Sequence, residues 1–141
     1  MKNGFVLAVI VVIIAMVISY VVWVYMNRLD YLSKTVHETN RWAVVMDSKG
    51  DILAVETTND EVWRTLKNLH QNQTAMWIGG VVEEYNNRWG FRFKPETIIA
   101  AQITIEGAQS NIQGISGDLD YWINIWGKET YVLARVVETH E

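Results

Sequence analysis

Residues that could carry acid–base or metal chemistry are scattered along this chain rather than grouped. None of the three histidines, His37, His70 and His140, has a second His or a carboxylate at ligand spacing on the same element. The adjacent carboxylates Glu83 and Glu84 would point to opposite faces of a strand. We therefore expect no metal site, and we expect these glutamates to lie on a solvated surface.

Motifs of catalytic sites are also missing. Asp118 and Asp120 are two apart on an expected helix, so their side chains diverge. Residues 114–117 read Gly-Ile-Ser-Gly, which is one residue short of a nucleophile elbow and lies in the same expected helix. Asp47 and Asp51 lack the ligand spacing of a calcium loop and are expected to form a turn. We predict that the chain is not an enzyme, with no catalytic residues, metal or cofactor.

The densest local pattern runs from Tyr85 to Pro95. Three aromatic residues alternate there with Gly90, Arg92 and Lys94, the period of a half-buried strand. In one interpretation the aromatic residues are core and the basic residues face water. In the other, a basic stripe flanked by aromatic rings binds a carboxylate or an acidic partner. The candidate partner-binding residues are Tyr85, Arg88, Trp89, Arg92 and Lys94.

An uncharged apolar run, Phe5–Met26, precedes all of these residues. As a helix it would measure roughly 33 Å, enough to cross the hydrocarbon core of a bilayer. Aromatic and basic residues near its C-terminal end suit the headgroup region. The residues expected at the membrane interface are Tyr20, Trp23, Tyr25 and Arg28. The sequence therefore predicts a single-pass membrane protein in contact with the lipid bilayer, with its anchor at residues 1–26.

Two other interpretations of this run were weighed. A cleavable signal peptide would have a shorter apolar region followed by small residues, whereas Val24-Tyr25-Met26-Asn27-Arg28 ends this run. A pilin-type leader is suggested by residues 2–5, Lys-Asn-Gly-Phe, but Val9 stands where pilins usually carry Glu. An uncleaved anchor fits the run best.

Several features bear on which side of the membrane holds the rest of the chain. A simple count of basic residues around the run would place it in the cytoplasm. The absence of cysteine, the many Trp and Tyr residues, and the N-glycosylation sequence at Asn72 favour the other side. We expect an extracytoplasmic domain in the cell membrane, with Asn72 as a candidate glycosylation site.

The remaining chain divides into a juxtamembrane helical stalk at residues 27–41 and one domain at 42–141. Without cysteine the domain must be held by packing alone. It carries eight basic and fourteen acidic residues, a net charge of −6 with His neutral. This charge is a poor match for nucleic acid, so no nucleic-acid partner is expected.

Hydrophobic periodicity predicts a small α+β domain with a mainly antiparallel sheet and two helices, in the order β-β-α-β-β-β-α-β. A capping box at residues 58–61 should begin the first helix, with Val62, Leu66 and Leu69 buried. The second helix should run through residues 112–126 and stop at Gly127. The strands are expected at 43–46, 52–56, 77–85, 89–94, 99–105 and 131–137.

One segment resembles a known family. Tyr85-Asn86, Trp89-Gly90-Phe91 and Pro95-Glu96-Thr97-Ile98, which follow Gly79-Gly80-Val81-Val82, resemble the small N-terminal domain of a calmodulin-binding-protein family over about residues 52–138. The family pattern also carries Cys-Asp and Cys-Pro-Trp motifs that this chain lacks. The whole chain is similar to small single-pass membrane proteins of ammonia-oxidising archaea, which implies an accessory membrane protein with an outward-facing domain. Neither resemblance supplies a catalytic residue.

These features together predict an anchored accessory or scaffold protein. Its domain would bind protein subunits of a larger membrane or envelope complex. The alternatives are a membrane-tethered sensor of a small ligand and, further off, a pilin-like subunit or a metal-assisted enzyme.

Overall fold

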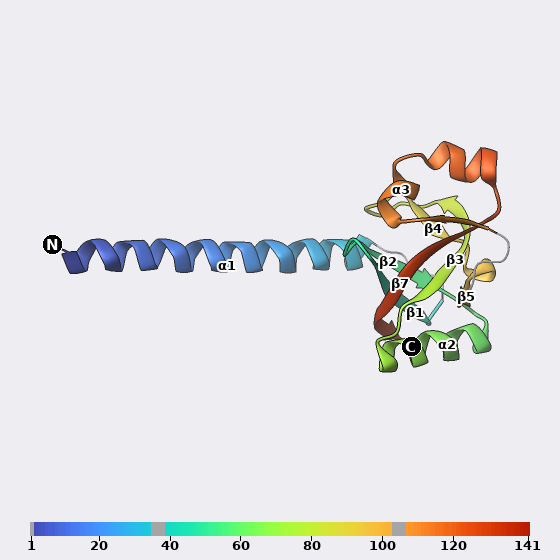
Figure 1. Ribbon diagram of the computed structural model, residues 1–141, viewed down its shortest axis with the longest axis horizontal. Helices are drawn as coiled ribbons and strands as arrows, with labels where there is room; N and C mark the ends of the chain where they lie inside the picture. The colour runs from blue at the N-terminus through green and yellow to red at the C-terminus, as the bar shows by residue number, and fades with distance from the viewer. Residues whose placement is uncertain (1, 35–38, 103–106) are drawn as a thin grey trace. The chain divides into compact units, whose positions relative to one another are not determined.

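The computed structural model describes residues 2–34, 39–102 and 107–141. The chain divides into two compact units, with the boundary between residues 34 and 35. The first unit is a single helix and the second is a folded domain (Figure 1). Each unit is described by itself below.

Helix α1 (Lys2–Lys34) forms the first unit. Its segment Lys2–Asn27 is long and apolar enough to cross a membrane, and none of its apolar window is buried within the protein. Side chains such as Phe5 and Met16 are therefore largely exposed, which costs free energy in water but not in lipid. The predicted apolar helix is confirmed. It continues without a break into the predicted stalk, of which residues 35–38 lie outside the described part.

The second unit contains one sheet in which five strands lie side by side. Their order is β2 (Ile52–Glu56), β1 (Trp42–Asp47), β7 (Glu129–His140), β3 (Met76–Glu84) and β4 (Phe91–Phe93). Two short strands complete the sheet, β5 (Ile99–Ala101) beside β3 and β6 (Ala108–Ser110) beside β7. Only the β6–β7 pairing is parallel among the described strands. The predicted α+β class with a mainly antiparallel sheet is confirmed.

Most strand boundaries differ from the prediction by one to three residues, and two differences are larger. The sequence analysis extended the fifth strand to Ile105, but β5 ends at Ala101 and residues 103–106 lie outside the described part. It also missed β6, whose three residues, Ala-Gln-Ser, have neither alternating hydrophobicity nor β-branched side chains. A strand this short is defined by its neighbour β7 and not by its own residues.

Helix α2 (Asp60–Asn72) begins one residue later than the predicted capping box implies. Its N-cap is Asn59, whose side-chain oxygen accepts hydrogen bonds from the N–H groups of Glu61 and Val62 at 2.9 and 3.1 Å. Thr58 has the capping-box spacing to Glu61, but Asn is an equally good cap, and the chain uses it. The predicted cap at Thr58 is therefore wrong by one position.

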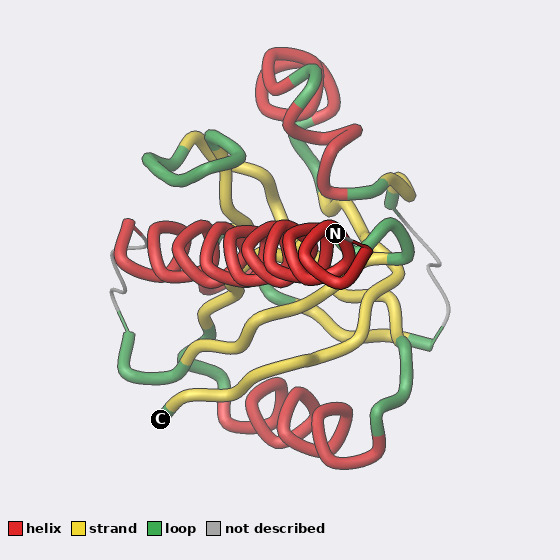
Figure 2. Tube along the Cα trace, turned by 90° about the vertical axis from the view of Figure 1, so that its left-hand side faces the viewer, coloured by secondary structure: helices red, strands yellow, loops and turns green. Residues whose placement is uncertain are grey.

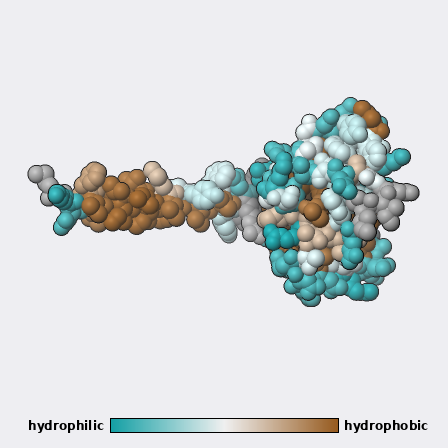
Figure 3. Space-filling view, in the orientation of Figure 1, coloured by the Kyte–Doolittle hydropathy of each residue, from teal (hydrophilic) through white to brown (hydrophobic). Residues whose placement is uncertain are grey.

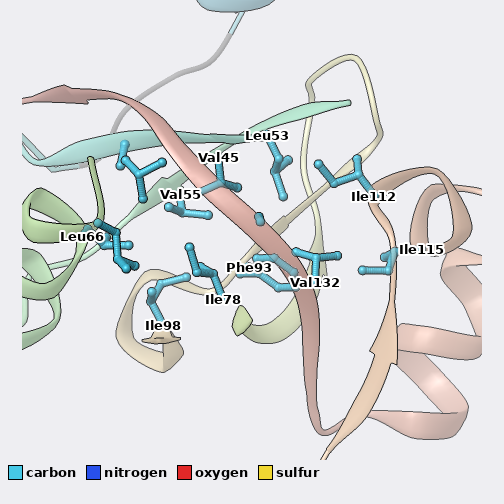
Figure 4. Packing of buried hydrophobic residues seen from close by; sticks show 14 of the residues in the cluster. Val45, Leu53, Val55, Leu66, Ile78, Phe93, Ile98, Ile112, Ile115 and Val132 are labelled. Atoms are coloured by element: carbon cyan, nitrogen blue, oxygen red, sulfur yellow. The ribbon is translucent and has the colours of Figure 1, made fainter. Parts of the chain in front are cut away.

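The hydrophobic core gathers side chains from α2, from five strands and from a short helix, α3 (Ile112–Ser116) (Figure 4). In Figure 2 the strands lie between α2 and the segment that begins with α3. Helix α2 contributes Trp63, Leu66 and Leu69 to this core, whereas the predicted Val62 is only partly buried. The large indole of Trp63 therefore occupies a core position beside Leu66 and Leu69.

The predicted helix over residues 112–126 is two separate pieces. Helix α3 ends at Ser116, and a π-helical segment, η2 (Tyr121–Trp126), follows after a turn. Two glycines, Gly114 and Gly117, lie in and just after α3, and each is about 1 kcal/mol less favourable than Ala in a helix. The continuous prediction was therefore wrong, although the predicted stop at Gly127 is confirmed by its left-handed conformation, with φ of 60°.

The pair Gly79-Gly80 in β3 marks a close approach of backbones. A Cβ atom added at Gly79 would lie 1.9 Å from the carbonyl oxygen of Thr130 in β7. One added at Gly80 would lie 2.7 Å from the Thr97 hydroxyl, which itself accepts a hydrogen bond from the Val81 N–H. No larger residue fits at Gly79 without moving β7.

Asp47 joins the end of β1 to the start of α3. Its side chain is almost fully buried. One carboxylate oxygen, Oδ1, accepts hydrogen bonds from the N–H groups of Lys49 and Asp51, at 2.9 and 3.0 Å. The other, Oδ2, accepts from the N–H of Ile112 at 3.0 Å. The predicted turn is therefore present. The Asp47 carboxylate also accepts a hydrogen bond from Ile112, which lies 65 positions further along the chain.

We predict that Asp47→Ala lowers the free energy of unfolding by roughly 2–3 kcal/mol, because the buried N–H of Ile112 loses a charged acceptor. Chemical denaturation of the full chain in mild detergent, followed by near-ultraviolet circular dichroism, measures this loss. The matched variant Asp51→Ala removes a carboxylate from the same turn and should cost less than about 0.5 kcal/mol. Equal losses for the two variants would contradict the role assigned to Asp47.

Candidate functional site

The predicted partner-binding residues lie on the hairpin formed by β3 and β4. The two strands pair Glu83 with Arg92, and the turn between them is closed by the Tyr85 N–H donating to the Gly90 carbonyl at 3.0 Å. The Asn87 side chain fixes this turn. Its oxygen accepts from the N–H groups of Trp89 and Gly90, and its amide nitrogen donates to the Phe91 carbonyl at 2.7 Å. These hydrogen bonds fix the conformation of the hairpin end.

Trp89 makes most of its contacts within the domain. Its indole N–H donates to the Ile52 carbonyl in β2 at 2.7 Å, and its ring packs against the core. Its own carbonyl accepts a hydrogen bond from the Ser116 hydroxyl at the end of α3, also at 2.7 Å. One residue thus connects the hairpin to β2 and to α3, as the packing interpretation requires.

Arg92 is engaged within the domain. Its Nε lies 2.7 Å from Oε1 of Glu83 on the paired strand, and only 12% of its side chain is exposed. The guanidinium also lies over the Tyr85 ring, 4.3 Å from the centroid. An ion pair and a ring contact therefore already occupy this cation. The solvated surface predicted for Glu83 did not anticipate this ion pair, because the pair forms only through the register of β3 and β4.

Arg88 is the cation that the hairpin end presents to solvent. It is exposed and lies 5.1 Å from the Trp89 ring centroid. Lys94 is partly exposed at the other end of β4, where its backbone N–H donates to the Val81 carbonyl. The structure therefore brings Tyr85 close to Arg92, and Trp89 close to Arg88.

A shallow hollow lies beside the hairpin end. It has a volume of about 300 Å³ and is lined by Glu84, Tyr85, Asn86, Gly90 and Leu119. We call it the hairpin hollow. Leu119 lies in the helical residues that lead directly into η2, after the turn at residues 117–118, and the sequence pattern does not connect it to the hairpin. No signal in the sequence joins positions 85 and 119, because only the folded chain brings them together.

A second hollow, of about 330 Å³, lies at the turn between β1 and β2. Among its lining residues are Met46, Lys49, Leu133 and Arg135. Leu133 and Arg135 are exposed side chains of β7, and Met46 pairs with Arg135 across the strands. Both hollows are open to solvent.

Two of the three histidines, His70 and His140, lie in the described part of the domain. His70 lies within 3.3 Å of the Thr139 hydroxyl, and His140 stacks on Trp42 with ring centroids 3.8 Å apart. His37 lies outside the described residues. In the ranges that the structure describes, no group of three His, Cys, Asp or Glu residues could hold a metal ion.

The remaining predicted site residues lie on helices. Tyr20 and Trp23 are exposed on α1 with their rings stacked at 6.3 Å, and Tyr25 is exposed nearby. The side chain of Arg28 lies outside the described part. Asn72 is the last residue of α2 and is exposed, so the glycosylation sequence lies on the surface.

A polar cluster connects the start of the domain to its end. Arg41 forms an ion pair with Asp60 at the start of α2, and Glu141 lies near Arg41 and Lys67. The hydrogen bond from Arg41, reinforced by its charge, lowers the pKa of Asp60. The Trp63 indole, followed by the Lys67 cation, lowers the pKa of Glu141. Both carboxylates are therefore stabilised in their charged forms.

We predict that Arg41→Ala raises the pKa of Asp60 toward its usual range, with a smaller rise for Glu141. Because both values are lowered by folding, any stability they confer is present at neutral pH and is lost as the pH falls through the lowered values. NMR titration of the side-chain carboxyl groups measures the change. Lys49→Ala, which removes a distant surface cation, should leave both values unchanged. An unshifted Asp60 in Arg41→Ala would contradict the pairing.

Comparisons with known proteins identify no relative. No family model matches the chain, and no curated protein and no solved structure matches it. The resemblances to a calmodulin-binding-protein family and to archaeal membrane proteins therefore stay predictions.

Proposed function

We propose that this protein is a single-pass membrane-anchored accessory protein whose folded domain binds a protein partner in a larger membrane or envelope complex. The observation that carries the proposal is the apolar helical segment Lys2–Asn27. Its most apolar stretch is not buried anywhere within the protein. Such a surface is stable in lipid and unstable in water. The anchor then holds the domain beside other membrane components.

The hairpin hollow is the proposed contact with the partner. Its floor is formed by side chains such as Tyr85 and Leu119, and Arg88 stands exposed in the turn that borders it. An apolar side chain of a partner would fill the hollow while a partner carboxylate approaches Arg88. The rigid turn supports this assignment, since a preformed surface loses little conformational entropy on binding.

Photo-crosslinking tests this surface. A benzoyl-phenylalanine at position 86, in the hollow, should form adducts with a partner under ultraviolet light in native membranes. The same residue at position 68, on the exposed face of α2, replaces an equally exposed Asn and should not. Adding Arg88→Glu should reduce the adduct at position 86 several-fold, whereas Arg64→Glu on α2 should not. Equal adducts at both positions, or none at either, would refute the proposed surface.

We further propose that the domain is extracytoplasmic, supported by the exposed Asn72 sequence and the absence of cysteine. Because the chain has no cysteine, a single introduced thiol reports its own side of the membrane. In intact cells a membrane-impermeant maleimide should label Lys49→Cys in the domain and spare Asn3→Cys before the anchor. Labelling of position 3 alone would place the domain in the cytoplasm.

A further inference from the structure

The π-helical segment η2 presents apolar side chains on the surface of the folded domain. Ile125 is 70% exposed, whereas the other strongly exposed apolar side chains described in this unit are at most 41% exposed. Tyr121, one turn earlier, is also exposed, and Trp126 is partly exposed. The space-filling view shows a hydrophobic patch on the surface over this part of the chain (Figure 3). Burying the Ile125 side chain against another apolar surface would be favourable, because it would remove apolar area from water.

The same segment is held firmly from its inner side. Trp122 and Ile123 pack against the core, and the Trp122 indole N–H donates to the Gly114 carbonyl at 3.3 Å. The Trp126 indole N–H donates to the Glu129 carbonyl at 3.1 Å. Gly127 then ends the segment in a left-handed conformation. The outward residues therefore belong to a fixed element and not to a loose loop.

We propose that Tyr121, Ile125 and Trp126, here called the η2 patch, dock the domain on the bilayer that holds its own anchor, at the level of the lipid headgroups. This inference rests on the proposed membrane anchoring. Tyr and Trp with an adjoining aliphatic residue have the composition that favours the membrane interface. Lys128 adds a cation 5.7 Å from the Trp126 ring, where a lipid phosphate could approach.

The anchor supplies the reason to favour lipid over a separate protein. Asn27, at the end of the apolar segment, and Thr39, at the start of the described domain, can be at most roughly 40 Å apart even if the chain between them is fully extended. The domain therefore stays near a bilayer at high effective concentration. A patch too weak to bind membranes on its own can be occupied under this condition.

The charges around the η2 patch specify the kind of lipid surface. Asp118 and Asp120 precede the patch and Glu129 follows it, against the single cation of Lys128. With the domain at −6, attraction to anionic lipid is not available to it. Docking should therefore depend on apolar burial, occur on zwitterionic lipid, and change little with salt.

Site-directed spin labelling of the full chain in nanodiscs tests the inference. The natural absence of cysteine allows a nitroxide at Ile125→Cys alone, with Asn68→Cys on α2 as the matched aqueous control. In phosphatidylcholine discs the ratio of oxygen to nickel-chelate accessibility should be several-fold higher at position 125 than at 68. A second label at Tyr121→Cys should show the same elevation and lose it when Ile125→Glu is added, with the circular dichroism unchanged.

Each other outcome overturns the inference. Equal ratios at positions 125 and 68 in discs that contain the integrated protein would show that the patch faces water, with the anchor intact. A ratio that rises only when phosphatidylglycerol is added, and falls with salt, would replace apolar docking by charge attraction. A loss of nickel-chelate accessibility at position 125 that appears only when other membrane proteins are added would assign the patch to a protein partner. Failure of the chain to enter discs at all would instead overturn the anchoring on which both proposals rest.

Discussion

The folded domain depends on the buried carboxylate of Asp47. A charged group removed from water is tolerated only when hydrogen bonds replace its hydration, and Asp47 obtains three from backbone N–H groups. Two close the turn that defines the register of β1 and β2, and the third orients the start of α3. The position of α3 in turn places Ser116 against Trp89 and Leu119 beside the hairpin. The position of the residues around the candidate site thus depends on the hydrogen bond between Asp47 and Ile112, which lies outside that site.

The hydrophobic periodicity of the sequence and its turn-forming residues were sufficient to predict most of the architecture. The apolar run, the alternating strands and Gly127 all identified elements that the structure contains. The failures have physical causes. β6 has no pattern of its own, and the two glycines in and beside α3 end a helix whose apolar spacing suggested continuity. The cap at Asn59 was missed because two good capping residues are adjacent.

The candidate site was less predictable than the fold. The hairpin and its aromatic core followed from alternation, but the partners of its cations did not. Arg92 and Glu83 are nine residues apart in the sequence and meet only through the strand register. The link from Trp89 to Ile52 spans 37 residues, and it turns a candidate contact residue into a structural one. Side-chain engagement of this kind is decided by tertiary packing, which local patterns do not encode.

The indole of Trp89 also has a consequence for self-association. Strand β2 is the outermost strand on its side of the sheet, where unpaired backbone groups can recruit a strand from another molecule. By occupying the carbonyl at the first residue of β2, Trp89 withholds a hydrogen-bond acceptor from such a neighbour.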